Sequence, residues 1–380
     1  MMSHSFYDWV KVSQVFHGVE IPQLGDIVIE TWNTKTGEQV STRQPFYHYQ
    51  GSYSSQIVIQ IRGNEVIFDG NISRLDRTDN LYGFTSLDEA MIAINRVMAE
   101  HGLPPFTKST RSTLAQSSDG LQCFIADGAR FQRLDVTTNI AVGKGNINAY
   151  LKMLATQKVG HYLPHLWDDE KSVTWQSRIK GATRLIFHKA YDKAHDLLLH
   201  TLPKIKRSCG EDSKEHQYVL DLIKFCEEQG IVRLEQELKN EFLKRHGLNY
   251  WGLVEEADIM RIHQKFLELD EAVKVTAIDL ESISEALVRA GACNSIRSAN
   301  ITAIHAINWK EGRVFNGSEI SYKRHRARLR KIGLDIAIPY KNNRHNVVTF
   351  VREQRQVTVN KQVTPPSWYK MPCHLKVVGQ

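Results

Sequence analysis

Apolar residues recur with two spacings along the first 248 positions. In 129–142 they alternate with polar residues, as in a strand with one apolar face. In 86–105 they recur every three to four residues, after a Ser86–Glu89 capping-box pattern and before Gly102. These patterns predict strands at 25–32, 54–68 (with a turn at 62–64), 129–142, 172–177, 183–193 and 231–238, and helices at 86–105, 145–158, 213–230 and 240–248.

The pattern changes at Tyr250, after which helical spacing dominates. We therefore predict an α+β protein: an antiparallel-sheet domain over 1–248, a smaller helical region over 249–345, and an extended C-terminal tail over 346–380. The predicted helices of the second part are 252–269, 279–290, 295–308 and 318–332.

Composition narrows the class of protein. The chain has 380 residues, 42% hydrophobic, with a formal net charge of +7. This basic excess favours an anionic partner, first nucleic acid and second a membrane surface, although ordinary surface charge explains it equally well. The five cysteines form no C-x-x-C pair, which argues against a disulfide framework or a structural zinc site. Without a long apolar run or a signal-peptide pattern, we expect a cytoplasmic protein.

Two acidic residues lie in similar strand contexts, Asp135 in Arg-Leu-Asp and Glu235 in Arg-Leu-Glu. Carboxylates are natural ligands of Mg²⁺ or Mn²⁺, and acids on two strands can meet at one metal ion. The alternatives are a surface or turn-facing aspartate at 135 and a cross-strand Arg–Glu salt bridge at 235.

The stretch HKAYDKAHD, residues 188–196, sets a tyrosine between two lysines. If the strand runs through 193, Lys189, Tyr191 and Lys193 share one face. A phenol is a weak nucleophile near neutral pH, so a nearby cation or metal would help it attack a phosphate. The alternative is that Tyr191 packs in the core or at its rim.

The segment SYKRHRARLRK, residues 321–331, contains six cations and no acid. A solvated helix face normally mixes charges of both signs, so contact with phosphates is the favoured interpretation. No G-x-x-x-x-G-K-S/T motif occurs, which argues against a P-loop nucleotidase. The predicted DNA-binding residues are Lys323, Arg324, Arg326, Arg328, Arg330 and Lys331.

Taken in order, these segments resemble the gene II/X family of filamentous-phage and plasmid replication initiators. The resemblance runs from about 47 to 340 and includes FDGNISRLDRTDNLYG (68–83), RLDVTTN (133–139), TRLIFHKAYDK (183–193) and GIVRLEQEL (230–238). It implies that Tyr191 is the DNA-linking nucleophile, with Lys193 beside it, and that Asp135 and Glu235 belong to a metal site. The family's Gly-His-Asn is Thr78-Asp79-Asn80 here, so Asp79 would replace the histidine as a ligand.

The resemblance implies an enzyme that nicks one strand of a double-stranded origin, starts rolling-circle replication and rejoins the displaced strand. It implies a divalent cation, Mg²⁺ or Mn²⁺, a host polymerase and a host helicase, and no membrane partner. The fold would be distantly like the rolling-circle initiator endonucleases, with a permuted order of elements left open. The rival class is a non-catalytic regulator that binds double-stranded DNA; an RNA-binding protein would need aromatic stacking motifs that the sequence lacks.

Overall fold

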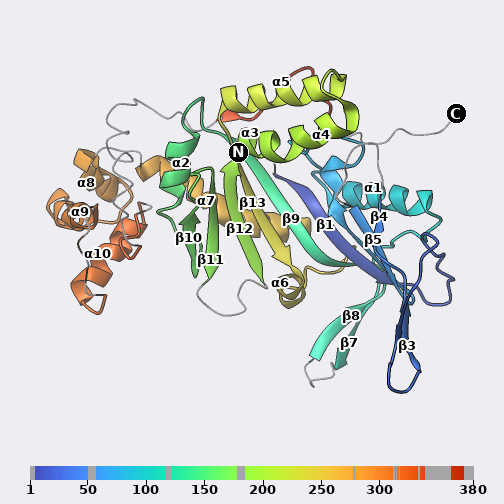
Figure 1. The fold of residues 1–380 in the computed structure, drawn as a ribbon. Coiled ribbons are helices and arrows are strands. Elements are labelled where there is room, and N and C mark those ends of the chain that lie inside the picture. The colour runs from blue at the N-terminus through green and yellow to red at the C-terminus, as the bar shows by residue number, and fades with distance from the viewer. Residues whose placement is uncertain are drawn as a thin grey trace.

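The computed structural model describes residues 5–49, 57–116, 122–177, 185–276, 280–310, 313, 315, 317–332, 334–338 and 361–371. Within them a ten-stranded sheet has the order β10–β11–β12–β13–β9–β1–β6–β5–β4, with β14 also paired to β9 (Figure 1). Each pairing is antiparallel, as the sequence predicted. The strands are β1 Ser5–Val15, β4 Tyr47–His48, β5 Ile57–Arg62, β6 Glu65–Asn71, β9 Arg130–Ala141, β10 Tyr162–Leu166, β11 Ser172–Ser177, β12 Ile186–Asp192, β13 Ile231–Lys239 and β14 Lys361–Gln362.

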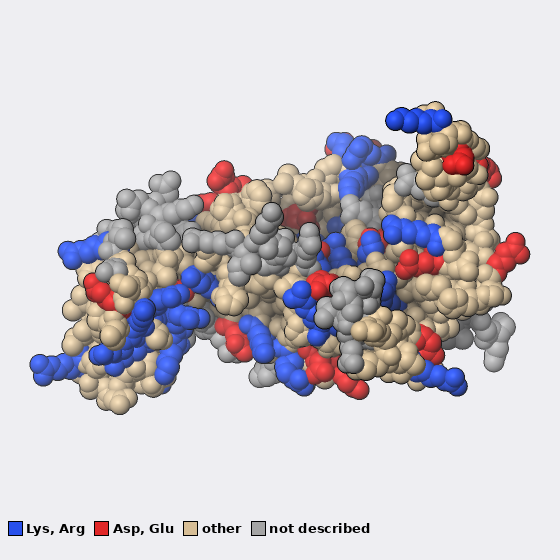
Figure 2. Space-filling view, turned by 90° about the horizontal axis from the view of Figure 1, so that it is seen from below, with Lys and Arg blue, Asp and Glu red and all other residues tan. Residues whose placement is uncertain are grey.

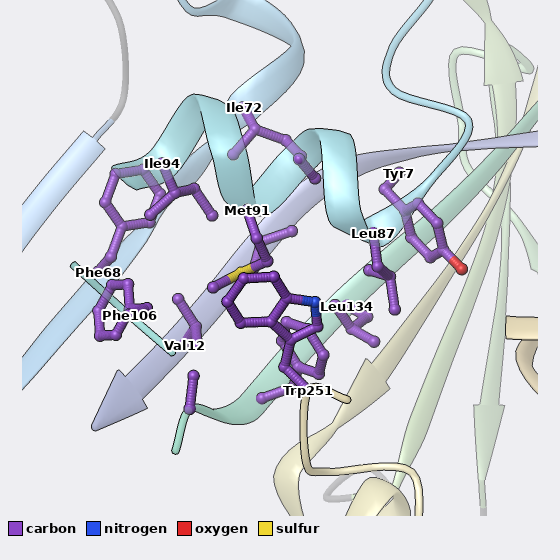
Figure 3. Close-up of a cluster of buried hydrophobic side chains, with 14 of the residues drawn as sticks. Tyr7, Val12, Phe68, Ile72, Leu87, Met91, Ile94, Phe106, Leu134 and Trp251 are labelled. Carbon is purple, nitrogen blue, oxygen red and sulfur yellow. The ribbon is translucent and has the colours of Figure 1, made fainter. Parts of the chain in front are cut away.

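One face of the sheet is apolar and carries helices α1 (Leu87–Glu100), α2 (Ile147–Leu154), α6 (Asn240–Arg245) and α7 (Glu256–Thr276). Figure 3 shows Met91 of α1 lying over Val12 and Leu134 of the strands. A neighbouring cluster sets Phe266 of α7 against Trp175 of β11. Helix α7 therefore packs on the sheet although it follows the predicted boundary at 248, and that boundary stays a prediction.

The other face is covered at one end by α3 (Lys193–Asp196), a π-helical turn (Leu197–Thr201), α4 (Leu202–Cys209) and α5 (Lys214–Gln229) (Figure 1). Ser213 caps α5 by accepting a hydrogen bond from the His216 amide at 3.1 Å. Gly230 ends it with φ of 63°, where a side chain would collide with the Gly143 carbonyl. Both ends match the helix predicted at 213–230.

Strand β1 was not predicted, although it occupies the middle of the sheet. Its register to β9 shifts between Tyr7 and Trp9, so Asp8 is an extra residue in a β-bulge. The bulge breaks the apolar–polar alternation that identifies a strand in sequence. It also turns Asp8 toward the polar face of the sheet, where it contacts Asn80 and Arg233.

Two hairpins and a helical region extend from this body (Figure 1). The hairpins are β2 Ile29–Trp32 with β3 Gln39–Arg43, and β7 Ser112–Gln116 with β8 Gln122–Ala126. Helices α8 (Leu280–Arg289), α9 (Ile296–Lys310) and α10 (Ile320–Arg330) share a separate apolar core. Within the described residues, no helix combines the length and apolar character needed to cross a bilayer.

Candidate active site

Polar side chains of three adjacent strands meet on the face of the sheet opposite α7. Across β12 and β13, Lys189 is paired with Glu235 and Tyr191 with Arg233. Across β13 and β9, Glu235 is paired with Thr137. Since alternate residues of a strand point to the same side, these five side chains share one surface.

Tyr191 lies at the centre of this surface and is half-buried. Its hydroxyl donates a hydrogen bond to Glu235 Oε2 at 3.2 Å. The ammonium groups of Lys189 and Lys193 lie 5.4 and 5.9 Å from the centre of its ring. The structure thus brings together the tyrosine and both lysines of the 188–196 stretch, with the acid at 235.

Lys193 reaches this place by a different route from the one predicted. Strand β12 ends at Asp192, which caps α3 by accepting from the His195 amide at 3.2 Å, and Lys193 is the first residue of that helix. The prediction that the strand runs through 193 is wrong. Since Asp192 favours a helix start, the chain turns there and brings Lys193 over the ring from the helical side.

The surroundings of Tyr191 keep it a neutral phenol beside a carboxylate. Burial raises the pKa of the Tyr191 hydroxyl well above its ordinary value, and the Glu235 carboxylate adds to the rise. Burial, the largest single influence, disfavours the ionised form of Glu235 too. The Lys189 ammonium, 2.7 Å from Oε1, acts with Arg233 and a hydrogen bond from Asp135 to lower the pKa of Glu235 overall. The tyrosine proton therefore already points at an ionised acceptor.

Asp135 and Glu235 form a carboxyl pair, as the sequence suggested. Burial raises the pKa of Asp135 to about 8; Arg133, which binds it at 2.8 and 2.6 Å, opposes the rise, and the nearby Glu235 carboxylate adds to it. Arg133 also lies 3.5 Å from Glu237. The alternative for Glu235 was a salt bridge with an arginine on a neighbouring strand, but its ion pair is with Lys189. In this pair the proton is therefore held by Asp135 near neutral pH, while Glu235 stays ionised.

This pair has the chemistry of a partial metal site. Mg²⁺ in phosphoryl-transfer sites is held by one or two carboxylates, with substrate phosphate oxygens and water completing its shell. The buried hydroxyl of Thr137, beside the pair, makes no hydrogen bond within the described residues and is free to meet a ligand. Among all the residues that the structure describes, no group of three or more His, Cys, Asp or Glu side chains is placed to hold a metal ion.

Asp79 contacts a different set of residues. It accepts hydrogen bonds from Tyr369 at 2.8 Å, from Tyr218 at 3.2 Å and from the Leu81 amide at 2.8 Å, and it lies 3.5 Å from Arg77. Its role as a metal ligand stays a prediction that none of these contacts supports.

Asn80, the neighbour of Asp79, is a site residue that sequence reasoning did not assign. Its amide oxygen accepts from Lys193 at 2.9 Å and from Arg74 at 3.3 Å. Its amide nitrogen donates to both oxygens of Asp8, at 3.1 and 2.9 Å. The signal was present, because Asn80 is the asparagine of the family's Gly-His-Asn segment, whereas nothing in the sequence singled out Asp8.

Lys193 is fully buried and held from two sides. Besides Asn80, its ammonium binds Asp196 at 2.7 Å. Burial and the nearby Arg233 lower the pKa of Lys193, while Asp196 opposes that shift. The positive charge of this site is therefore ordered by neighbouring groups before any substrate arrives.

The basic segment forms α10, and its cations have different surroundings. Arg326 binds Asp335 at 2.7 and 3.1 Å, and Arg330 lies 3.9 Å from the same acid. Arg328 donates to Thr302 at 3.4 Å. The side chains of Lys323, Arg324 and Lys331 are exposed. Figure 2 shows Lys and Arg side chains gathered on this helical part of the molecule, so its exposed cations remain the candidates for phosphate contact.

Comparison with known proteins identifies the family. Residues 6–257 match the N-terminal family, and residues 287–375 the C-terminal family, of the phage replication-associated protein encoded by gene II. The chain belongs to the gene II family of replication-associated proteins. It is 43% identical to the replication-associated gene II protein of Escherichia phage If1 over 322 residues, which are 84% of this chain and 99% of that relative. No solved structure matches the chain.

Proposed function

We propose that this gene II family member nicks one strand of a double-stranded replication origin, with Tyr191 as nucleophile. The observation that carries the proposal is the hydrogen bond from the Tyr191 hydroxyl to Glu235, set between two lysines. A tyrosine that only packs needs neither an ionised acceptor nor two cations at its ring.

In the proposed reaction, Glu235 takes the proton of Tyr191 as the phenolic oxygen attacks the scissile phosphorus. The bond from phosphorus to the 3′ oxygen breaks, and that oxygen leaves as a hydroxyl after taking a proton from solvent. Lys189 and Lys193 stabilise the negative charge that develops on the reacting oxygens. The products are a 5′-phosphotyrosyl link at Tyr191 and a free 3′ hydroxyl that a host polymerase extends as a host helicase separates the strands.

The covalent link conserves the energy of the phosphodiester bond. Attack by a 3′ hydroxyl on the phosphotyrosine reverses the first step and rejoins the displaced strand, with Glu235 returning its proton to Tyr191. No nucleotide is consumed in this cycle, in agreement with a sequence that has no P-loop motif.

We propose that Mg²⁺ or Mn²⁺ binds at Asp135 and Glu235. When bound there, such a cation polarises the scissile phosphate. The residues of this chain supply the two carboxylates, and Arg133 and Lys189 orient them.

Incubation with supercoiled plasmid carrying the cognate origin tests the proposal. With Mg²⁺ the wild type should convert the plasmid to the open circle and become covalently attached to DNA, and EDTA should prevent both. Tyr191→Phe should do neither. The matched control is Tyr250→Phe, because Tyr250 donates its hydroxyl to the Phe124 carbonyl away from this cluster, and it should nick at the wild-type rate. A Tyr191→Phe protein that nicks as fast as the wild type contradicts the assignment.

The second candidate is a non-catalytic regulator that binds double-stranded DNA, which the exposed cations of α10 would also serve. The same assay separates the two functions, because a regulator shifts the plasmid in a binding gel but leaves it supercoiled and forms no covalent adduct.

A further inference from the structure

The chain returns to the sheet domain after the helical region. Residues 361–371, which we name the C-terminal strap, begin with β14, where Lys361 pairs with Ala141 and Gln362 with Ile140 of β9. Strand β1 pairs with β9 only as far as Ser5 and Thr138, so the strap occupies the next positions along β9. Val363 and Tyr369 of the strap are buried with residues of α3 and α5.

The strap holds the loop 77–82 through the hydroxyl of Tyr369. This hydroxyl donates to Asp79 Oδ1 at 2.8 Å and accepts from the Tyr82 amide at 3.1 Å and from Arg77. Tyr82 in turn donates its hydroxyl to the Val363 carbonyl at 2.8 Å. The loop and the strap are therefore joined by several hydrogen bonds, and Asp79 and Tyr82 on either side of Asn80 are both fixed.

The opposite side of the same loop faces the candidate active site. Asn80 holds Lys193 at 2.9 Å, and the Asn80 and Leu81 carbonyls accept from Arg233 at 2.6 and 3.0 Å. Arg233 pairs with Tyr191 in the sheet register. A single short loop thus lies between the strap and the groups that surround the nucleophile.

We propose that the C-terminal strap is a positioning element of the nicking site: Tyr369 fixes Asp79 and Tyr82, and thereby holds Asn80 against Lys193. Asp79 is then an anchor for the strap. The strap follows the helical region in the chain and binds the loop by hydrogen bonds, so it links that region to the loop. This inference rests on the proposed nicking function of Tyr191.

If the strap only covered apolar surface, its aromatic rings would be enough and the hydroxyl of Tyr369 would have no role. Trp368 packs against Tyr218 and Phe225, and Tyr369 meets the ring of Tyr82 edge to face. Those contacts stabilise the fold whether or not the loop is held accurately. Tyr369→Phe keeps the ring contacts and removes only the hydrogen bonds, so it separates the two roles.

The test measures single-turnover formation of the covalent adduct on a single-stranded oligonucleotide that contains the nick site. Tyr369→Phe should lower the rate constant about tenfold, since small displacements of catalytic groups are costly, and leave oligonucleotide affinity within about twofold. Hydrogen exchange at the Tyr82 amide should become faster in this variant. The matched control is Lys370→Ala, which keeps the main-chain carbonyl that binds Arg77 and should react at the wild-type rate.

A wild-type rate constant in Tyr369→Phe overturns the proposal. A reduced amplitude of adduct at an unchanged rate constant overturns it too, because that result indicates only a loss of folded protein. If Tyr369→Phe does not fold, Tyr82→Phe decides, because it keeps the ring and removes only the hydrogen bond from the Tyr82 hydroxyl to the Val363 carbonyl of the strap. A lower rate constant at unchanged affinity then supports positioning, and an unchanged rate constant refutes it. Failure of the wild type itself to form the adduct, both on this oligonucleotide and on the supercoiled origin plasmid, instead refutes the nicking function.

Discussion

Glu235 accepts a hydrogen bond from the Tyr191 hydroxyl at Oε2, over 3.2 Å, and its Oε1 lies 2.7 Å from the Lys189 ammonium. One carboxylate thus orients the proton of the candidate nucleophile while a cation keeps that carboxylate ionised. Strand pairing sets this relationship, because Lys189 lies directly opposite Glu235 and Tyr191 lies two residues further along the same face.

Glu235→Gln removes the proton acceptor and keeps the shape of the side chain. We expect adduct formation to slow about 100-fold or more, with origin affinity nearly unchanged, because general-base catalysis contributes at that level. Quenched-flow or gel assays of the adduct measure the rate. The control is Glu237→Gln, which lies on the same face and pairs with Arg133 and Lys239 rather than with Tyr191.

The same variant distinguishes the two roles open to Glu235. If Glu235 serves only as a ligand of Mg²⁺, a higher Mg²⁺ concentration should restore the rate of Glu235→Gln. If it accepts the tyrosine proton, added Mg²⁺ should leave the defect in place. Complete rescue by Mg²⁺ would remove the proton-acceptor role from Glu235.

Lys189→Met tests the electrostatic control of Glu235. The Lys189 ammonium is the main group that lowers the pKa of this acid, so its loss raises the pKa of Glu235. A protonated Glu235 accepts no proton, and the acid limb of the rate against pH should therefore move to higher pH. Adduct rates between pH 5 and pH 8 measure the shift, and an acid limb at the wild-type position would count against it.

The exposed cations of α10 should contribute to DNA affinity through phosphate contacts. Arg324→Ala combined with Lys331→Ala should weaken origin binding and reduce the slope of log Kd against log salt by about 2. Fluorescence anisotropy over a salt series measures this slope. Arg326→Ala is the comparison: because Arg326 binds Asp335, we expect its loss to lower the thermal stability of the helical part first. An unchanged slope in the double variant would exclude Arg324 and Lys331 from docking.

His263 makes stability depend on pH. It is fully buried, lies 2.9 Å from the Thr138 hydroxyl, and burial lowers its pKa from 6.5 to about 3. As pH falls below 6.5, His263 becomes protonated in the unfolded chain but stays neutral in the folded chain. The free energy of unfolding is therefore highest near neutral pH and decreases as the pH falls toward 3. Urea unfolding at pH 7 and pH 5 should show a loss of about 2 kcal/mol from this residue. In His263→Gln the loss should be smaller by that amount; an equal loss would contradict the assignment.

Elements with strong local signals were predicted well from the sequence. The helix begun by Ser213 and ended by Gly230, the strand 130–141 and the turn after Arg62 appear where the patterns placed them. Capping residues, left-handed glycines and alternation act over a few residues, so they are visible in sequence. Strand β1 was not predicted because a bulge at Asp8 interrupts its alternation of apolar and polar residues. The end of β12 was predicted one residue too late because Asp192 begins a helix.

The sequence by itself determined the antiparallel α+β class, the ordered family segments and Tyr191 as the residue to mutate first. Tertiary structure decided which partners surround it. Glu235 reaches Tyr191 through strand pairing across 44 residues, and Tyr369 reaches Asp79 across 290. Such contacts depend on sheet order and on the path of the returning chain. The local spacing of apolar residues predicts neither the sheet order nor the path of the chain, because it indicates only which face of an element is apolar.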